Sequence, residues 1–330
     1  MKLPHRRQFL HLAASAAALP AVSRIARAQA YPTRPITMIV PFAPGGLADL
    51  IGRIAAEGMQ TSLGQPIIIE NVGGAAGNIG TGRVARAAPD GYTLVLGIWN
   101  THVANGAIYA LQYDVVKDFE PIALLADAPM LLVAHKSVPA NDLKEFIVWL
   151  KANPDKTSMG TVGAGSPPHL LGVLLQKETG TRFGLVPYRG AGTVIHDVVS
   201  GQIETTFINP GTSLPHVRAG SIKAFVVTAK NRLVAAPDIP FADEAGLPGF
   251  YFSLWAGLFA PRGTPKNIIS KLNAAAVGTF DDPAMRRKLA DQGYEFPPRE
   301  RQTPDALGSY QKAEIEKWWP IIKAAGIKGE

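Results

Sequence analysis

Short apolar runs alternate with segments of helical periodicity along most of the chain, and glycine-rich turns often stand between the two. Ile36–Val40 is a typical buried strand, and after the turn at Pro41–Gly46 the apolar residues recur at the three- and four-residue spacing of a helix. The same order returns from Pro66–Glu70 onward. Strands that alternate with helices form mostly parallel sheets covered by helices, so we expect an α/β fold.

The length of 330 residues favours two lobes over one. Two extended apolar segments, near Ala126–Met130 and near Ser253–Leu258, are suited to cross between lobes. We therefore expect a first lobe of residues 31–130 plus 255–330 around a second lobe of residues 131–254. Each lobe is expected to contain one mostly parallel sheet, with a hinge between the lobes.

Residues 1–30 differ in composition from the rest of the chain. A basic start precedes an alanine-rich apolar stretch, and the letters AQA at 28–30 provide a small-residue cleavage site. This order is typical of a secretory signal peptide, and the apolar stretch is too short to span a bilayer. The letters RRQFL at 6–10 also match the core of a twin-arginine signal. We expect export to the periplasm with cleavage near Ala30, by the twin-arginine or the general secretory route.

The charge balance changes once this segment is set aside. It holds five of the 33 Lys and Arg and no Asp or Glu, which leaves 28 basic against 26 acidic residues and a net charge of +2. This small excess does not indicate a nucleic-acid partner. The chain has no cysteine, which excludes disulfides and thiolate chemistry. No apolar stretch after residue 30 is long enough for a membrane span.

Four glycine-rich loops each stand between a strand and the helix that follows it. In open α/β sheets, ligands bind outside the carboxyl ends of the strands, where such loops lie. Each helix start also offers unpaired N–H groups and the positive end of the helix dipole, which favour an anion. Four such starts at one cleft would suit a small molecule with one or two carboxylates. The loops span residues 41–46, 73–78, 163–166 and 188–193.

Several residues in these loops have a structural alternative to ligand contact. Asn78, Ser166 and Thr193 are good N-cap residues. Asp49 stands at the start of its helix, where a carboxylate interacts favourably with the dipole. His169 is suited to capping or packing at its own helix start.

The loops carry many backbone donors and few titratable groups, which favours binding over reaction. No dinucleotide fingerprint, phosphate loop, nucleophile elbow or H-E-x-x-H metal motif occurs. Ser166 and His169 stand three residues apart, which does not by itself align a nucleophile with a base. We expect no catalytic residue, no metal and no cofactor. An exported hydrolase or isomerase that uses Ser166, His169 or Asp49 is the alternative from another class.

Seven ordered stretches of the chain resemble the tripartite tricarboxylate transporter substrate-binding family, also called the Bug receptors. The resemblance extends over essentially all of the chain after residue 30. The stretches are YPTRPITMIVPFAPGGLADLIGR (31–53), GQPIIIENVGGAAGNIGTGRVARAAPDGYTL (64–94), YDVVKDFEPIALLADAPMLLVAH (113–135), GAGSPPHLLG (163–172), VPYRGAGTVIHDVVSGQIETTF (186–207), LPHVRAGSIKAFVVTAKNR (214–232) and WAGLFAPRGTPKNII (255–269).

The resemblance implies a periplasmic solute-binding protein with a two-lobed, type II-like Venus flytrap fold. Its lobes would close by hinge motion on a small di-, tri- or aromatic carboxylate. The implied partners are two integral membrane subunits of an ion-coupled transporter, although some relatives serve a membrane sensor kinase instead. A monomer suits such a closing clamp.

The resemblance also implies that the two glycine-rich loops of the first lobe hold one ligand carboxylate, largely through main-chain amides and ordered waters. The second lobe would add contacts of its own. In the first lobe, we expect ligand contact from Phe42, Ala43, Gly45, Gly46, Asp49, Gly74, Ala75, Gly77, Asn78, Trp99 and Asn100. In the second lobe, we expect it from Ser166, His169, Tyr188, Gly190, Thr193 and Asn209.

Two features of the sequence bear on the ligand. Ile208-Asn209-Pro210 stands where the family often has an acidic residue after the Phe, which makes recognition of an amino group less expected. Trp99 either shapes a site for an aromatic or bulky ligand at the cleft mouth or packs in the interior.

Overall fold

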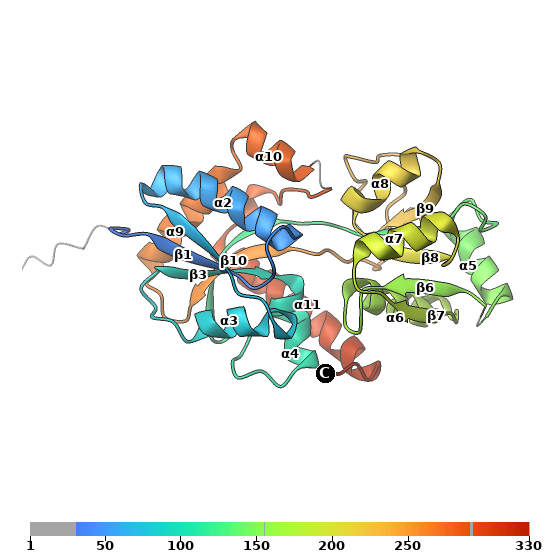
Figure 1. Ribbon diagram of the computed structural model, residues 1–330, viewed down its shortest axis with the longest axis horizontal. Coiled ribbons are helices and arrows are strands. Elements are labelled where there is room, and N and C mark those ends of the chain that lie inside the picture. The colour runs from blue at the N-terminus through green and yellow to red at the C-terminus, as the bar shows by residue number, and fades with distance from the viewer. Residues whose placement is uncertain (1–30, 155, 291–292, 330) are drawn as a thin grey trace, which may run out of the picture.

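Two five-stranded sheets, each flanked by helices, make up the two lobes of the molecule (Figure 1). The computed structural model describes residues 31–154, 156–290 and 293–329. The signal peptide predicted for residues 1–30 lies outside the described residues.

The first sheet has the strand order β2-β1-β3-β10-β4. Its strands are β1 (Ile36–Val40), β2 (Ile67–Asn71), β3 (Thr93–Ile98), β4 (Phe119–Ala126) and β10 (Ala256–Pro261). The helices of this lobe are α2 (Leu47–Leu63), α3 (Asn78–Ala85), α4 (Asn105–Ile108), α9 (Lys266–Thr279), α10 (Pro283–Ala290) and α11 (Pro304–Ala324). Short helical turns occur at η1 (Ala75–Gly77), η2 (Asn100–Ala104, a π-helix) and η3 (Arg299–Arg301).

The second sheet has the strand order β7-β6-β8-β5-β9. Its strands are β5 (Leu131–His135), β6 (Ser158–Thr161), β7 (Gly184–Pro187), β8 (Thr205–Ile208) and β9 (Ile222–Val227). Its helices are α5 (Leu143–Ala152), α6 (Pro167–Thr179), α7 (Ala191–Ser200) and α8 (Pro210–Arg218).

In each sheet, four strands run in one direction and a single strand opposes them. β10 is antiparallel to both β3 and β4, and β5 is antiparallel to both β8 and β9. The remaining pairs are parallel. The opposing strand is in each case the first one after the chain crosses between the lobes. The predicted α/β fold with two mostly parallel sheets is therefore confirmed.

Two extended segments carry the chain from one sheet to the other. Residues 127–130 lead from β4 to β5, and residues 253–255 lead back to β10. Leu254 N–H donates to the Ala128 carbonyl at 2.8 Å, and Pro129 bridges to Ser253. The pairing makes a narrow two-stranded connection, which is the geometry of a hinge. The exact limits of the two lobes stay a prediction.

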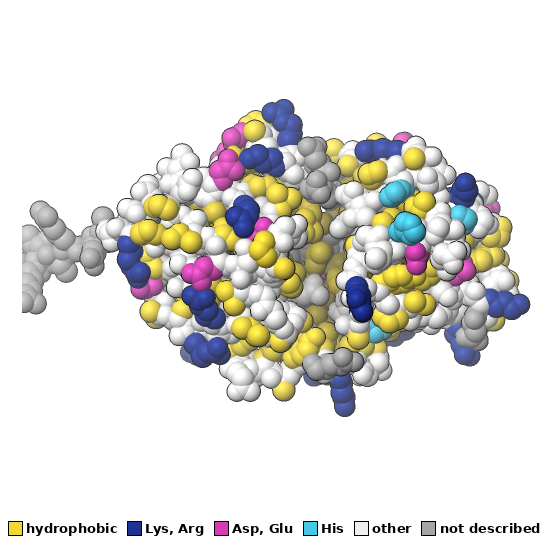
Figure 2. Space-filling view, in the orientation of Figure 1, with side chains coloured by type: hydrophobic (Ala, Val, Ile, Leu, Met, Phe, Trp, Pro, Cys, Tyr) yellow, Lys and Arg dark blue, Asp and Glu magenta, His cyan; other side chains and the backbone are white. Residues whose placement is uncertain are grey.

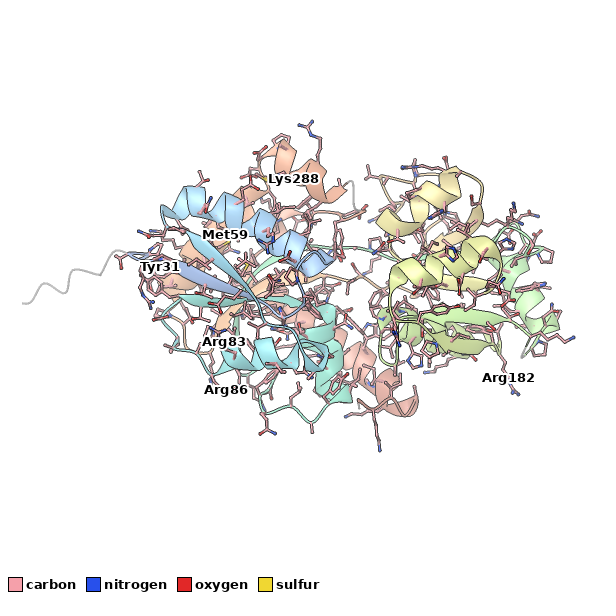
Figure 3. The ribbon with its side chains drawn as sticks, in the orientation of Figure 1. Tyr31, Met59, Arg83, Arg86, Arg182 and Lys288 are labelled. Atoms are coloured by element: carbon pink, nitrogen blue, oxygen red, sulfur yellow. The ribbon has the colours of Figure 1, made fainter. Side chains whose placement is uncertain are left out.

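The apolar face of α2 packs into the core of the first lobe. Met59 on this face has no exposed surface, because it points into the core between α2 and the sheet (Figure 3). Gly58 allows the close approach of α9, since a Cβ there would lie 2.3 Å from the Thr279 side chain. On the outer side, Lys288 of α10 pairs with Glu57 at 3.1 Å.

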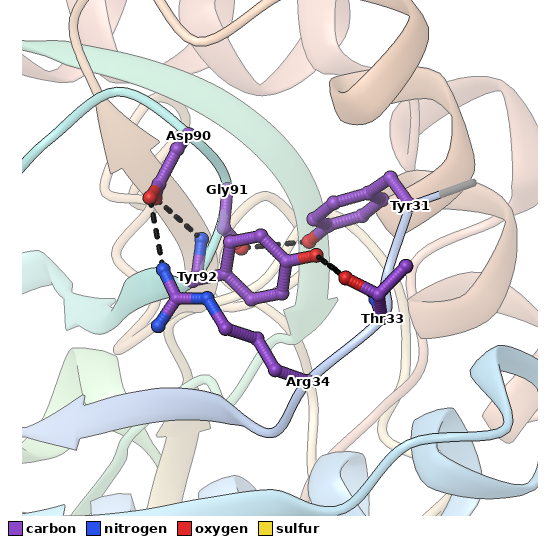
Figure 4. Close-up of polar contacts among 6 residues, drawn as sticks. All are labelled: Tyr31, Thr33, Arg34, Asp90, Gly91 and Tyr92. Carbon is purple, nitrogen blue, oxygen red and sulfur yellow. Dashed lines mark hydrogen bonds and ion pairs between the residues drawn. The ribbon is translucent and has the colours of Figure 1, made fainter. Parts of the chain in front are cut away.

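The first described residues are anchored at the end of β1 that lies away from the second lobe (Figure 4). Tyr31 donates its hydroxyl hydrogen to the Gly91 carbonyl at 2.6 Å and packs edge-on against Tyr92. Arg34 pairs with Asp90 at 3.0 Å and covers the Tyr92 ring. These contacts secure the start of β1, the strand that leads to the first glycine-rich loop.

Candidate functional site

A furrow separates the two lobes in the space-filling view (Figure 2). A hollow of about 160 Å³ lies between the start of α2 in the first lobe and the start of α8 in the second. Asn209 and Thr212 line it on one side, and Gly45 to Leu47 with Leu50 line the other. The hollow is therefore built from the carboxyl-terminal edges of both sheets, as expected for ligand sites in α/β folds.

Most of the helices that start beside this furrow lack a side-chain cap, and α8 is an exception. In α2, α3, α6 and α7, no described side chain accepts a hydrogen bond from the first-turn N–H groups. The helices α5, α8 and α11 are capped by Asp142, Asn209 and Thr303. Uncapped N–H groups at a helix start must bind solvent or a ligand, and their dipole favours an anion.

The predicted capping roles of Asn78, Ser166 and Thr193 are therefore wrong. The Ser166 hydroxyl donates to the Gly163 carbonyl at 2.7 Å, and the Thr193 hydroxyl donates to the Gly190 carbonyl at 2.8 Å. Both hydroxyls act as donors to a carbonyl, whereas a cap must accept from an N–H group.

Asn78 is the first residue of α3, and its side-chain oxygen accepts from Asn105 at 2.7 Å and from Tyr113 at 3.3 Å. Asn105 also donates to the Ala76 carbonyl at 2.9 Å. The Asn78 amide thus braces the loop that precedes α3.

The loop before α3 has four consecutive residues with positive φ. The values are 115° for Gly74, 46° for Ala75, 55° for Ala76 and 89° for Gly77. Alanine seldom adopts this region because its Cβ approaches the next carbonyl oxygen, so the conformation costs about 1–2 kcal/mol for each alanine. Such strain persists only where neighbours fix the backbone, and it is frequent at ligand-binding loops.

Asp49 holds the other loop of the first lobe in place. Its carboxylate is buried and accepts hydrogen bonds from Gly45 N–H, Arg53 Nε and Asn71 Nδ2, each at 2.9 Å. Asn71 donates in addition to the Phe42 carbonyl at 3.1 Å. The hydrogen bond from Arg53, helped by those from Gly45 and Asn71, lowers the pKa of Asp49 to about 2 against the opposing effect of burial. The structure gives Asp49 a positioning role.

Two titratable side chains beside the second-lobe loops are also engaged. His169 Nδ1 accepts from Gly165 N–H at 2.9 Å, and partial burial lowers the pKa of His169. Tyr188 donates its hydroxyl hydrogen to Asp197 at 2.9 Å. Because the Ser166 hydroxyl hydrogen is directed to a carbonyl, Ser166 and His169 do not form a nucleophile–base pair here.

Trp99 packs in the interior. It has no exposed surface, its Nε1 donates to Glu314 at 2.9 Å, and its ring meets Phe252 and Trp318 edge-on at 5.0 and 5.5 Å. Of the two roles open to Trp99, the structure supports packing. Asn100, the next residue, begins the π-helix η2 and is half-buried.

Sequence reasoning missed the polar residues that brace the loops, namely Asn71, Asn105 and Arg53. Asn71 had a usable signal, because it is the last residue of β2 and a polar side chain at a carboxyl strand end faces the loops. Arg53 stands one helical turn after Asp49, which is the spacing of an ion pair.

The described part of the chain has no group of three His, Cys, Asp or Glu placed to hold a metal ion. Within the same part, no helix is both long and apolar enough to cross a bilayer.

The molecule has two α/β lobes joined by a paired hinge, and uncapped helix starts lie beside the furrow. These features place it in the class of two-lobed ligand-binding proteins. The model of the tripartite tricarboxylate transporter family receptor matches residues 51–327. The chain belongs to this family, as the sequence resemblance predicted.

Relatives cover nearly the whole chain. Protein BugT of Bordetella pertussis is 34% identical over 303 residues, which are 91% of this chain and 92% of that protein. The structure of MatC from Rhodopseudomonas palustris with bound malate is 40% identical, covers 88% of this chain and 100% of that one, and has a TM-score of 0.75. The structure of R. palustris Rpa4515 with adipate is 32% identical, covers 90% and 99%, and has a TM-score of 0.76.

Proposed function

We propose that this protein captures a small carboxylate between its two lobes in the periplasm and delivers it to a membrane transporter. The observation that carries the proposal is the set of uncapped helix starts on both sides of the furrow, at α2 and α3 in the first lobe and at α7 in the second. The oxygens of a small carboxylate can accept hydrogen bonds from such N–H groups.

Backbone groups would provide most of the recognition. The residues that line the hollow between α2 and α8 are all uncharged. The amides of α2 and of the strained loop Gly74–Gly77 would bind the ligand on one lobe, and the amides of α7 on the other. A ligand held by both lobes binds the closed form more tightly, so it shifts the population toward closure about the hinge at residues 127–130 and 253–255.

The relatives support the ligand class. The two solved relatives described above contain malate and adipate, which are both carboxylates. Membership of a transporter receptor family supports delivery to a transporter, and the signal peptide predicted at residues 1–30 supports the periplasmic location. Two integral membrane subunits are the partners that this function requires.

The test is a calorimetric and thermal-shift screen of the protein purified from the periplasm against di-, tri- and aromatic carboxylates. At a free concentration one hundred times the Kd, a true ligand stabilises the folded state by about 2.7 kcal/mol. Intact recovery of the bound compound by mass spectrometry would oppose a hydrolase or isomerase. If no carboxylate binds and none is recovered from the denatured protein, the proposal is wrong.

A matched pair of proline substitutions isolates the helix-start amides. Ala191→Pro removes one N–H from the first position of α7, where proline is compatible with a helix. Lys266→Pro makes the same change at the start of α9 on the far side of the first lobe. We expect about a tenfold loss of carboxylate affinity in the first variant, the loss of roughly one hydrogen bond to a charged group, and none in the second. If Ala191→Pro binds the carboxylate as tightly as Lys266→Pro does, the start of α7 is not part of the site.

A further inference from the structure

The second lobe contains an apolar pocket at the carboxyl ends of β6 and β8. Its volume is about 150 Å³. It is lined by Met130, Val162, Pro167, Pro168, Ala191, Val194, Thr206, Phe207, Ile208, Asn209 and Leu254. None of these side chains is charged, and the Thr206 hydroxyl is already satisfied by the Gly160 carbonyl at 2.8 Å. The pocket therefore offers a polar ligand few partners.

The start of α6 adds to this apolar character. Its first two residues are Pro167 and Pro168, which have no backbone N–H. The N–H of Ser166 just before them is bonded to the Gly163 carbonyl at 3.2 Å. The start of α6 thus presents proline rings where the other uncapped helices present amide donors. The start of α6, which the sequence suggested as an anion site, therefore offers few N–H donors.

The apolar pocket adjoins the polar part of the furrow. Asn209 lines both this pocket and the hollow at the start of α2. Met130 and Leu254, which also line the pocket, lie in or beside the two hinge segments. One small ligand can therefore place a charged end against the amides of the first lobe and its remaining atoms in the second-lobe pocket.

We propose that the ligand is a carboxylate with a compact apolar body, of the size of an aromatic or alicyclic ring, and that the second-lobe pocket selects this body. This inference rests on the proposed function and narrows its ligand class. An apolar cavity of about 150 Å³ is large enough to hold benzene. A hydroxyl or second carboxylate in the same place would lose its hydration and find few hydrogen-bond donors among the mostly apolar lining residues, which is unfavourable.

The first experiment measures the Kd values of benzoate, cyclohexanecarboxylate and malate by calorimetry on the protein purified from the periplasm. We expect at least one ring acid to bind tenfold or more tightly than malate. If malate binds as tightly as both ring acids or more tightly, the inference is wrong while the proposed function stands. If neither these three nor any other carboxylate binds, the proposed function itself is wrong.

Substitutions at Val162 connect this preference to the pocket. Val162, the partly buried residue that follows β6, lines the pocket, so Val162→Phe fills it, and we expect this variant to weaken ring-acid binding at least tenfold and malate binding less. Val148→Phe, at a position on α5 that is 62% exposed, is the matched control and should change neither affinity.

Val162→Thr is the second variant, for the case that Val162→Phe disturbs folding. It keeps the shape of the side chain and adds one hydroxyl to the pocket. Thermal unfolding of each variant without ligand verifies the fold. A several-fold loss for the ring acid supports the assignment. Unchanged ring-acid affinity in a folded Val162→Thr variant would overturn it.

Discussion

The two sides of the furrow use the same strand–loop–helix unit to present different surfaces. In the first lobe, a buried carboxylate and two asparagines fix the loops before α2 and α3, and the helix starts keep their amide donors. In the second lobe, the start of α6 has two prolines, and an apolar pocket lies beside it. The comparison shows that a glycine-rich loop before a helix does not define an anion site until the first helical residues are examined.

The largest expected effect is the loss of the brace in the first lobe. Asp49→Ala removes the buried carboxylate that accepts hydrogen bonds from Gly45 N–H, Arg53 Nε and Asn71 Nδ2, and hydrogen bonds to a charged group contribute about 1.5–3 kcal/mol each. We expect the free energy of unfolding in urea to fall by about 3 kcal/mol and carboxylate affinity to fall at least tenfold. Asp142→Ala removes only a remote helix cap, so it should cost about 1 kcal/mol and leave binding intact. If Asp49→Ala binds the carboxylate as tightly as the wild type, the hydrogen bonds of Asp49 are not needed for binding.

The same carboxylate predicts a pH dependence. The pKa of Asp49 is lowered from 3.8 to about 2 in the folded protein, so the unfolded chain takes up this proton first as the pH falls. The stabilisation is complete above about pH 4 and is lost progressively toward pH 2. In Asp49→Asn, urea unfolding between these pH values should show a smaller loss than in the wild type. Identical slopes would contradict the lowered pKa.

A glycine pair tests the strained loop of the first lobe. At Gly77, φ is +89° and a Cβ would lie 2.8 Å from the Thr101 side chain and 3.1 Å from the Pro41 carbonyl oxygen. At Gly45, φ is +81° and a Cβ would meet nothing within 4 Å. Gly45→Ala should therefore cost about 1–2 kcal/mol from the backbone alone, and Gly77→Ala should cost about 1–2 kcal/mol more. Equal losses of unfolding free energy would mean that the contacts around Gly77 relax freely.

Asn209 lies where the polar and apolar parts of the furrow meet. Asn209→Asp keeps an oxygen that caps α8 but places a negative charge beside the bound anion. We expect stability within about 0.5 kcal/mol of the wild type and a five- to tenfold loss of carboxylate affinity that becomes smaller at high salt. A loss of affinity that does not depend on salt would indicate that the substitution acts through the shape of the site and not through its charge.

The smallest expected effect comes from making the second lobe resemble the first. Pro167→Ala restores an N–H at the start of α6, and it should improve the affinity for malate a few-fold relative to benzoate. Pro304→Ala at the start of α11 is the control and should leave both affinities unchanged. If the ratio of the two affinities is the same in all three proteins, the prolines of α6 do not set the preference.

The sequence alone specified the α/β class and the loops that flank the furrow, because the spacing of apolar residues and the position of glycines are local properties. Local rules failed at α8, which has Pro210 at its first position and Pro215 inside it. Tertiary contacts decide this helix, since Asn209 caps it and Leu214 is buried in the core of the second lobe. The strand β4 was not predicted, and the sequence indicated only an extended segment near Ala126–Met130, because β4 is defined by pairing with β10 from far along the chain.

The roles of the site residues depended still more on tertiary structure. Their positions in the sequence made Asp49 and Trp99 expected ligand contacts, each with a structural alternative. Partners distant in sequence decide for the structural role: Asn71 donates to one Asp49 oxygen, and Trp318 and Phe252 enclose Trp99. A sequence shows which groups can donate, accept or pack. Only the folded arrangement decides which of them are already satisfied within the protein and which are left for a ligand, because that depends on contacts between residues far apart in the chain.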